Sequence, residues 1–265
     1  MALVSRFEDG RVRRGTALVA VLFLAAGTLL VPLQAAELSR NDKIIDNFLT
    51  ACQENKQLDD QKLDKLTKLV SALRQDEDFR DATITEALRE LYPEFDSALK
   101  SLGEEETKPA IEALGKLAAA DDRFLAAESA FFLARAYLMN ERFEDALPLL
   151  RKLSSNWSDK TLHFGQSLFL QGVSESRLLL RKEAIGSLNA FLEKSKDAPE
   201  RMRVGAWRHM RLLQLIEDGS IDDVQDRMDY SRRRLALKNS GKKTRDVQDS
   251  IIAMLDKLIK EAEKK

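Results

Sequence analysis

The sequence predicts an all-α protein built from successive antiparallel helical hairpins, and three observations support this fold class. The chain has 265 residues, of which 44% are hydrophobic, so it can form a core and is not disordered throughout. It holds only 11 Gly and 5 Pro, too few for the many tight turns of a sandwich or barrel of this length. Apolar residues recur at helical intervals along the body of the chain, and no segment alternates convincingly, so we predict no strands.

The first element is a targeting segment over residues 1–36. Arg11, Arg13 and Arg14 precede a run without charge, Gly15 to Leu33, and small residues follow it. A basic end, an apolar stretch and small residues near a cleavage point are typical of a secretory signal peptide. The alternative is an uncleaved membrane anchor, because 19 uncharged residues are close to the length of a span. Either interpretation places the body outside the cytoplasm, in the periplasm or secreted.

Residues 37–93 are expected to form N-terminal helical hairpins. Three helical stripes of apolar residues lie within 44–52, 63–73 and 84–91, and polar residues separate them. The single cysteine, Cys52, lies on the first stripe and is predicted to be buried, with a free thiol or lipid attachment as alternatives. One cysteine excludes an internal disulfide.

Residues 94–240 repeat themselves. Ala134, Gly172 and Leu212 align at spacings of 38 and 40 residues. Twelve and sixteen positions after each of them stand further small or apolar residues, namely Ala146, Ala184, Val224, Leu150, Leu188 and Met228. We interpret each unit as two antiparallel helices, with the small residues where the helices cross most closely and larger apolar residues beside the crossing. Such hairpins must stack on neighbours to bury their second face.

This pattern resembles the tetratricopeptide repeat (TPR). The best unit matches the family's motif at Ala130, Leu133, Ala134, Tyr137, Phe143, Ala146, Leu150 and Leu153, and Glu141 stands where a turn glycine is usual. The second unit departs at Glu175 and Arg181, where an aromatic residue is usual. The third matches at Leu212, Leu215, Gly219, Ile221, Val224 and Met228. The resemblance implies a right-handed α-solenoid, and an irregular helical bundle is the competing interpretation.

The resemblance also implies a groove for a protein or peptide, lined by the first helix of each repeat. The groove positions carried over from the family are Glu128, Phe131, Arg135, Met139, Gln166, Phe169, Arg177 and His209. The phenylalanines would supply apolar contact and the arginines forked donors for a carboxylate or carbonyl group. The competing interpretation is that N-terminal helices cover the same phenylalanines.

Residues 241–265 are expected to form one amphipathic helix that caps the last repeat, because the end of a stacked array must be covered. A short coiled-coil dimer is the alternative. Just before and within this segment lies a basic patch without acids: Arg232, Arg233, Arg234, Lys238, Lys242, Lys243 and Arg245. We interpret it as a solvated helix end, with contact to an acidic partner or membrane surface as the alternative. Few aromatics accompany it, which argues against nucleic acid.

No motif for catalysis or for a cofactor is present. The two histidines lack a neighbouring carboxylate or second histidine at ligand spacing, and there is no phosphate-binding loop, so we expect no enzyme and no metal. The expected function is a non-enzymatic scaffold or adaptor that binds another protein or peptide through a TPR-like groove. The alternative is a structural component of a cell-envelope complex, bound through its ends or its convex face.

Overall fold

The structure is a computed structural model, and it describes residues 31–264 except 56, 57 and 77; for residues 31–39 only the backbone is described. The predicted signal peptide therefore lies outside the described residues up to position 30. Within the described part the protein is all-α, as predicted, and contains no strand. None of the helices in this part of the chain combines the length and apolar character that crossing a membrane requires.

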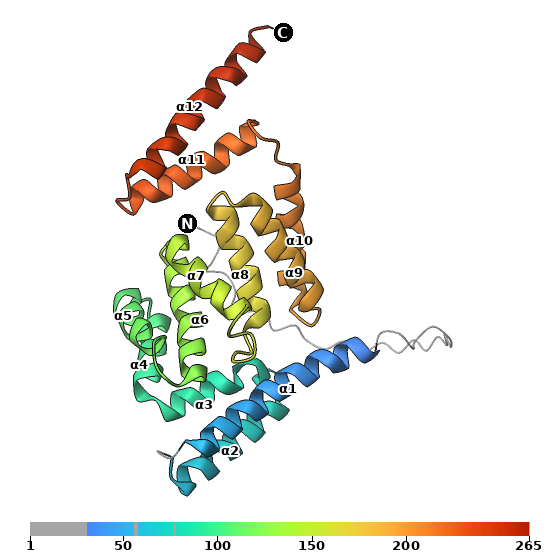
Figure 1. Ribbon diagram of the computed structural model, residues 1–265, viewed down its shortest axis with the longest axis vertical. Helices are drawn as coiled ribbons and strands as arrows, with labels where there is room; N and C mark the ends of the chain where they lie inside the picture. The colour runs from blue at the N-terminus through green and yellow to red at the C-terminus, as the bar shows by residue number, and fades with distance from the viewer. Residues whose placement is uncertain (1–30, 56–57, 77, 265) are drawn as a thin grey trace, which may run out of the picture.

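The N-terminal layer of helices lies at the lower end of the molecule in Figure 1. Its elements are α1 (Val31–Glu54), α2 (Asp60–Gln75), the short 3₁₀ helix η1 (Arg80–Ala82) and α3 (Thr83–Leu91). The Asp59 side chain caps α2 by accepting a bond of 2.8 Å from the amide of Lys62, which is the usual role of an aspartate before a helix.

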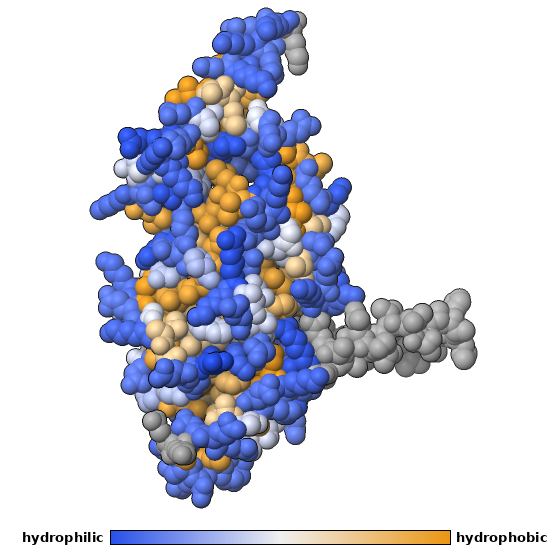
Figure 2. Space-filling view, in the orientation of Figure 1, coloured by the Kyte–Doolittle hydropathy of each residue, from blue (hydrophilic) through white to orange (hydrophobic). Residues whose placement is uncertain are grey.

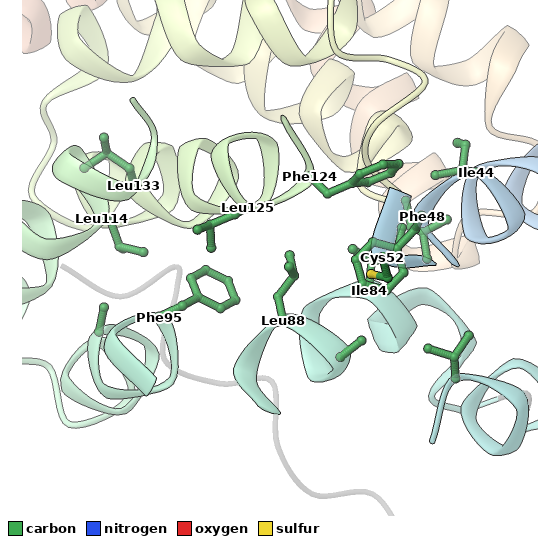
Figure 3. Packing of buried hydrophobic residues seen from close by; sticks show 14 of the residues in the cluster. Ile44, Phe48, Cys52, Ile84, Leu88, Phe95, Leu114, Phe124, Leu125 and Leu133 are labelled. Atoms are coloured by element: carbon green, nitrogen blue, oxygen red, sulfur yellow. The ribbon is translucent and has the colours of Figure 1, made fainter. Parts of the chain in front are cut away.

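This layer and the following helices share the largest core of the protein, shown in Figure 3. Phe48 of α1 meets Phe124 edge-on, with ring centroids 5.2 Å apart. Ile84 and Leu88 of α3 are fully buried in the same cluster. Cys52 lies in the same core, as predicted. The three apolar stripes of residues 44–91 thus converge on one cluster.

Six helices in the middle of the chain each pack against the helix before and the helix after. They are α4 (Pro93–Gly103), α5 (Thr107–Leu117), α6 (Arg123–Met139), α7 (Phe143–Ser154), α8 (Phe164–Arg177) and α9 (Arg181–Lys194). Ala134 of α6 and Ala146 of α7 are fully buried and pack with Leu150, so these helices approach closely. In the next pair, Gly172 of α8 lies against Leu188 of α9, where an added Cβ would come within 2.7 Å of the leucine side chain.

The same turn recurs in four hairpins. Glu105, Glu141, Leu179 and Lys238 each adopt a left-handed conformation, with φ between 55° and 63°. In each case the following amide donates to the carbonyl five residues earlier, over 2.8 to 2.9 Å. This is the pattern of a Schellman turn, which normally places a glycine at the left-handed position. The hairpins closed in this way are α4–α5, α6–α7, α8–α9 and α11–α12.

The last three helices are α10 (Glu200–Leu215), α11 (Ile221–Ala236) and α12 (Lys242–Ala262), and their pairing corrects the third predicted repeat. α10 packs against α9, but α11 turns away from α10 and pairs with α12 instead (Figure 1). As a result Leu212, Leu215, Ile221 and Met228, which the repeat alignment placed in a helix interface, are exposed. In α10 the buried residues are Ala206 and Leu213 rather than Leu212, whereas Val224 of α11, from the same alignment, is buried.

Candidate binding surfaces

The predicted groove is closed at its first unit. Glu128 and Phe131 on α6 are fully buried, so they cannot contact a partner, and their assignment to an open groove is corrected. Two segments that are distant in sequence cover them. Thr85 of α3 contacts Glu128, and the loop before α8 places His163 against Phe131.

The buried carboxylate of Glu128 is held by three polar side chains. Thr85 donates to Oε2 over 2.7 Å and Thr161 to Oε1 over 3.1 Å. His163 Nε2 lies 3.1 Å from Oε2, and its ring stacks on Phe131 with centroids 4.0 Å apart. All four polar residues lie in the protein interior, at the junction of α3, α6 and the loop between α7 and α8.

Electrostatics favour the charged form of Glu128. Burial acts to raise its pKa, but the charge of His163 and the hydrogen bonds from His163, Thr85 and Thr161 outweigh it and lower the pKa below its ordinary value. A buried charge with this many partners fixes the relative position of three chain segments. We therefore interpret the cluster as a joint that holds α3 against α6, in the place where the groove was expected.

The other predicted groove residues are not gathered in one place. Arg135 and Met139 are exposed on the second half of α6, Gln166 is exposed on α8, and Phe169 is half-buried beside Phe191. Arg177 and His209 do come together. Burial lowers the pKa of His209 and the nearby Arg177 charge lowers it further, so the imidazole is neutral at pH 7. Its Nε2 lies 2.9 Å from the hydroxyl of Ser176.

A cleft of about 510 Å³ lies beside this pair, between the α8–α9 turn, the end of α10 and α11. Asp223, which lines it, contacts Arg181 and Arg227, each over 3.1 Å, and accepts the amide of Gly219 over 2.9 Å. Asp226 also lines the cleft, and burial raises its pKa. The ion pair between Asp223 and Arg181 joins α11 to α9 across the cleft, so we interpret these residues as structural.

A second cleft, of about 830 Å³, lies at the other end of the molecule between α1 and the start of α6. The Tyr92 hydroxyl donates to Asp122 over 2.7 Å there. Burial raises the pKa of the Cys52 thiol to about 12, and the charge of Asp122 adds to this effect, so the thiol is protonated and unreactive at neutral pH. Among the described residues no three His, Cys, Asp or Glu side chains are grouped so that they could hold a metal ion.

The basic patch is divided between the surface and the interior. Arg233 and Arg234 are buried, which corrects their assignment to a solvated patch. The Arg234 guanidinium binds Glu144 of α7 over 2.6 Å and Thr244 of α12 over 2.8 Å. Arg233 donates to the carbonyl of Arg177 and lies over the Phe143 ring, 4.8 Å from its centroid. These two side chains anchor α11 to the body, while the other five members are exposed: Arg232, Lys238, Lys242, Lys243 and Arg245.

The C-terminal helices carry most of the exposed apolar surface of the described chain. Twelve large hydrophobic residues are exposed in the described part of the chain, and only Phe79 and Met139 of these lie before α10. The other ten are Val204, Trp207, Leu212, Leu215, Ile221, Met228, Leu235, Leu237, Ile252 and Ile259. Figure 2 shows apolar side chains at the surface in the upper part of the molecule, where these helices lie. Single exposed hydrophobic residues are ordinary, but here ten of the twelve lie in the last third of the chain, which makes this end the candidate binding surface.

The exposed side of α10 combines apolar and basic side chains. Val204 and Trp207 lie on it beside Arg203, Arg208 and Arg211, and none of these three arginines takes part in an ion pair among the described residues. The repeat alignment used this helix only for Leu212, Leu215 and the groove position His209. A usable signal was present: the apolar residues of this helix are too many for one buried stripe.

No family model matches the chain, and no curated protein and no solved structure matches it.

Proposed function

We propose that the protein is a non-enzymatic scaffold that holds another protein, and that the partner binds at its C-terminal end. The observation that carries the proposal is the concentration of exposed apolar side chains on α10–α12. The burial of Glu128 and Phe131 argues against binding in the expected groove, and so favours attachment through an end of the molecule.

The chemistry of α10 indicates what kind of partner would fit. Trp207 and the exposed arginines are the residue types that contribute most to protein interfaces, since they combine large contact area with directed hydrogen bonds. Arg203, Arg208 and Arg211 place exposed positive charge on this helix, and carboxylates on a partner would complement that charge. We therefore propose a partner whose contacting surface is acidic and partly apolar.

The repeated turns support a TPR-like architecture as part of this proposal. The hairpins α4–α5, α6–α7 and α8–α9 follow one another and are closed by the same backbone bonds. A stacked series of this kind is a rigid support, and a partner held at one end is fixed relative to whatever binds elsewhere. We propose that residues 93–194 serve as that support.

The proposed site of action is outside the cytoplasm, on the basis of the apolar segment at 15–33 and the basic residues before it. A fusion of residues 1–40 to a reporter that is active only after export should give activity. The same fusion to a reporter that works only in the cytoplasm should be silent, and the reverse result would contradict this part of the proposal.

Site-specific photo-crosslinking tests the binding surface. The full chain would carry a benzoyl-phenylalanine in place of Trp207 on α10 or, as control, in place of the exposed Lys116 on α5. We expect a crosslinked product of defined mass at position 207, containing a different protein, and none at 116. Replacing Arg203 and Arg208 by glutamate should reduce its yield strongly.

The charge reversal has its own control, because Lys116→Glu changes charge without touching α10. Equal products at positions 207 and 116, or no product at 207, would contradict the proposal. A product that contains only a second copy of this chain would contradict it as well.

A further inference from the structure

We infer that α10 and α11 are the two helices of a further hairpin, which is open in the structure and which closes when α11 folds back onto α10. The inference concerns the conformation of this end of the molecule and does not rest on the proposed partner. It starts from four residues that the repeat alignment places between these two helices. They are 54% to 69% exposed instead: Leu212, Leu215, Ile221 and Met228.

The two preceding hairpins show which residues face each other when such a pair is closed. In α6–α7, Ala134 packs with Leu150. In α8–α9, a Cβ at Gly172 would come within 2.7 Å of the Leu188 side chain. In both hairpins the second residue follows the first by 16 positions. This spacing therefore marks a close contact between the two helices.

α10 and α11 repeat both this spacing and the turn between the helices. Met228 follows Leu212 by 16 positions. Gly219, with φ 80°, stands seven positions after Leu212. The left-handed residues of the two preceding hairpins, Glu141 and Leu179, stand at the same point of their units, and in all three units the second helix begins two positions later. The sequence at this place therefore fits the turn of a closed hairpin.

A short elbow before the glycine makes the difference between the open and the closed form. α10 ends at Leu215, two positions earlier in its unit than α6 and α8 do. Ile216 is extended, with ψ 116°, so the chain leaves the helix there. The amide of Ser220 donates to Glu217 over 3.1 Å, whereas the corresponding amides of the two preceding hairpins donate to the carbonyl five residues earlier. Winding Ile216 and Glu217 into α10 would give the same turn as in those hairpins.

Arg181 and Asp223 occupy the two groups whose hydrogen bond closes the other hairpins. In α6–α7 and α8–α9 the amide of the left-handed residue donates over 3.0 Å to the carbonyl three residues earlier. Here that carbonyl belongs to Ile216 and accepts from Arg181 over 3.1 Å. The corresponding amide, of Gly219, donates to Asp223 over 2.9 Å. Arg181 and Asp223 also form an ion pair over 3.1 Å, so together they hold the elbow open.

The contacts that hold α11 on the body in the open form leave polar atoms unpaired. Tyr230 of α11 packs with Phe143 of α7. The buried hydroxyl of Tyr230 and the buried Nε of Arg233 have no hydrogen-bond partner among the described residues, and an unpaired buried polar group is costly. Closing gives up these contacts and covers Leu212 and Met228 instead, so each form has apolar contacts of its own.

Charge opposes closing. In α8–α9 the Gln171 side chain donates to Ser187 over 3.0 Å. The residues at the same positions of the α10–α11 unit are Arg211 and Arg227, so closing brings two positive charges together. Salt screens this repulsion. The closed form should therefore become more populated as the ionic strength rises.

Disulfide trapping in the purified chain, at low protein concentration, tests the closed form. Leu212→Cys with Met228→Cys should form an intramolecular disulfide when copper-phenanthroline and oxygen accept the two electrons and the two thiols release their protons. Leu212→Cys with Leu235→Cys is the matched control, since Leu235 is also exposed but lies ~10 Å beyond Met228 along α11. This pair should link far more slowly, because a disulfide requires Cα atoms within ~7 Å of each other. The native Cys52 is buried and does not compete.

A substitution at Arg181 tests what holds the hairpin open. Arg181→Met frees the Ile216 carbonyl and should raise the rate of trapping by about 10-fold or more. Arg151→Met is the matched control and should leave the rate unchanged, because Arg151 also pairs with a buried carboxylate, Glu175 over 2.9 Å, but lies on α7. Raising the salt concentration should accelerate trapping without any change at Arg181. Melting temperatures before oxidation show whether each variant is folded.

Three results would overturn the inference. The first is that the pair at 212 and 228 links no faster than the pair at 212 and 235, because α11 then does not reach α10 in the expected register. The second is that neither Arg181→Met nor salt accelerates trapping. The third is that Arg151→Met accelerates it as much as Arg181→Met, which would show a general loosening. The purified chain is measured without a partner, so none of these results depends on whether α10 captures another protein.

Discussion

Two helices of similar length, α6 and α10, show how differently the two ends of this molecule are built. α6 is buried on nearly all sides, because α3, α5 and α7 surround it and the loop before α8 closes the remaining gap. α10 is buried only along the side that faces α9, at Ala206 and Leu213. A helix that is surrounded contributes to stability, and a helix with half its surface free can contribute to binding. The C-terminal third is therefore where we expect substitutions to alter interactions without unfolding the protein.

The largest effect that the comparison predicts is at Glu128. Replacing it by alanine leaves His163, Thr85 and Thr161 buried without their common partner, and breaking a buried pair in this way costs ~3–5 kcal/mol. Glu217→Ala, at an exposed position in the loop after α10, should change the free energy of unfolding by less than ~0.5 kcal/mol. Urea denaturation of both variants measures the difference. Equal losses would mean that the Glu128 cluster does not hold α3 on α6.

A neighbouring pair of leucines on α10 tests the boundary between the two kinds of surface. Leu213 is 5% exposed and Leu212 is 63% exposed. Leu213→Ala removes buried methyl groups and leaves a cavity, so it should cost about 2 kcal/mol or more. Leu212→Ala should change stability by no more than ~0.5 kcal/mol. If the larger loss occurs at Leu212 instead, Leu212 is the residue that α9 covers, as the repeat alignment required.

The sequence was sufficient to predict that these segments are helical, but not which of their faces are covered. The last helix was expected after Gly241 and begins at Lys242, because its apolar residues form a single stripe. α10 carries leucines at 212, 213 and 215, which point in different directions, so a spacing argument could select the wrong one. Glu128 was assigned to a groove by resemblance to the repeat family, but its carboxylate is covered by Thr85, which lies 43 residues earlier in the chain. Contacts of that range leave no periodic signal in a single sequence.

The next prediction concerns the packing of α8 on α9 and gives effects of opposite sign. A Cβ at Gly172 would lie 2.7 Å from Leu188 Cγ and 3.2 Å from the Leu188 backbone nitrogen. Gly172→Ala should therefore cost ~1–3 kcal/mol through overpacking, reduced in part by the better helix propensity of alanine. At Gly186 of α9 a Cβ would meet nothing within 4 Å, so Gly186→Ala should stabilise by ~0.5–1 kcal/mol. Thermal unfolding measures both, and stabilisation by Gly172→Ala would show that the two helices do not approach this closely.

The smallest effect is expected at the repeated turns, and it tests whether the hairpins share one design. Glu105 is exposed and held at φ 62°, a conformation that costs ~1 kcal/mol for a residue other than glycine. Glu105→Gly should therefore stabilise the protein by up to ~1 kcal/mol, even though it removes a side chain and adds no contact. The same change at Glu112, in the interior of α5, should destabilise it by ~1 kcal/mol because glycine is a poor helix former. The two variants have the same composition, so a difference in melting temperature reports the backbone conformation alone. If both are destabilised equally, Glu105 is not left-handed in solution, and the common turn of α4–α5, α6–α7 and α8–α9 would lose its first member.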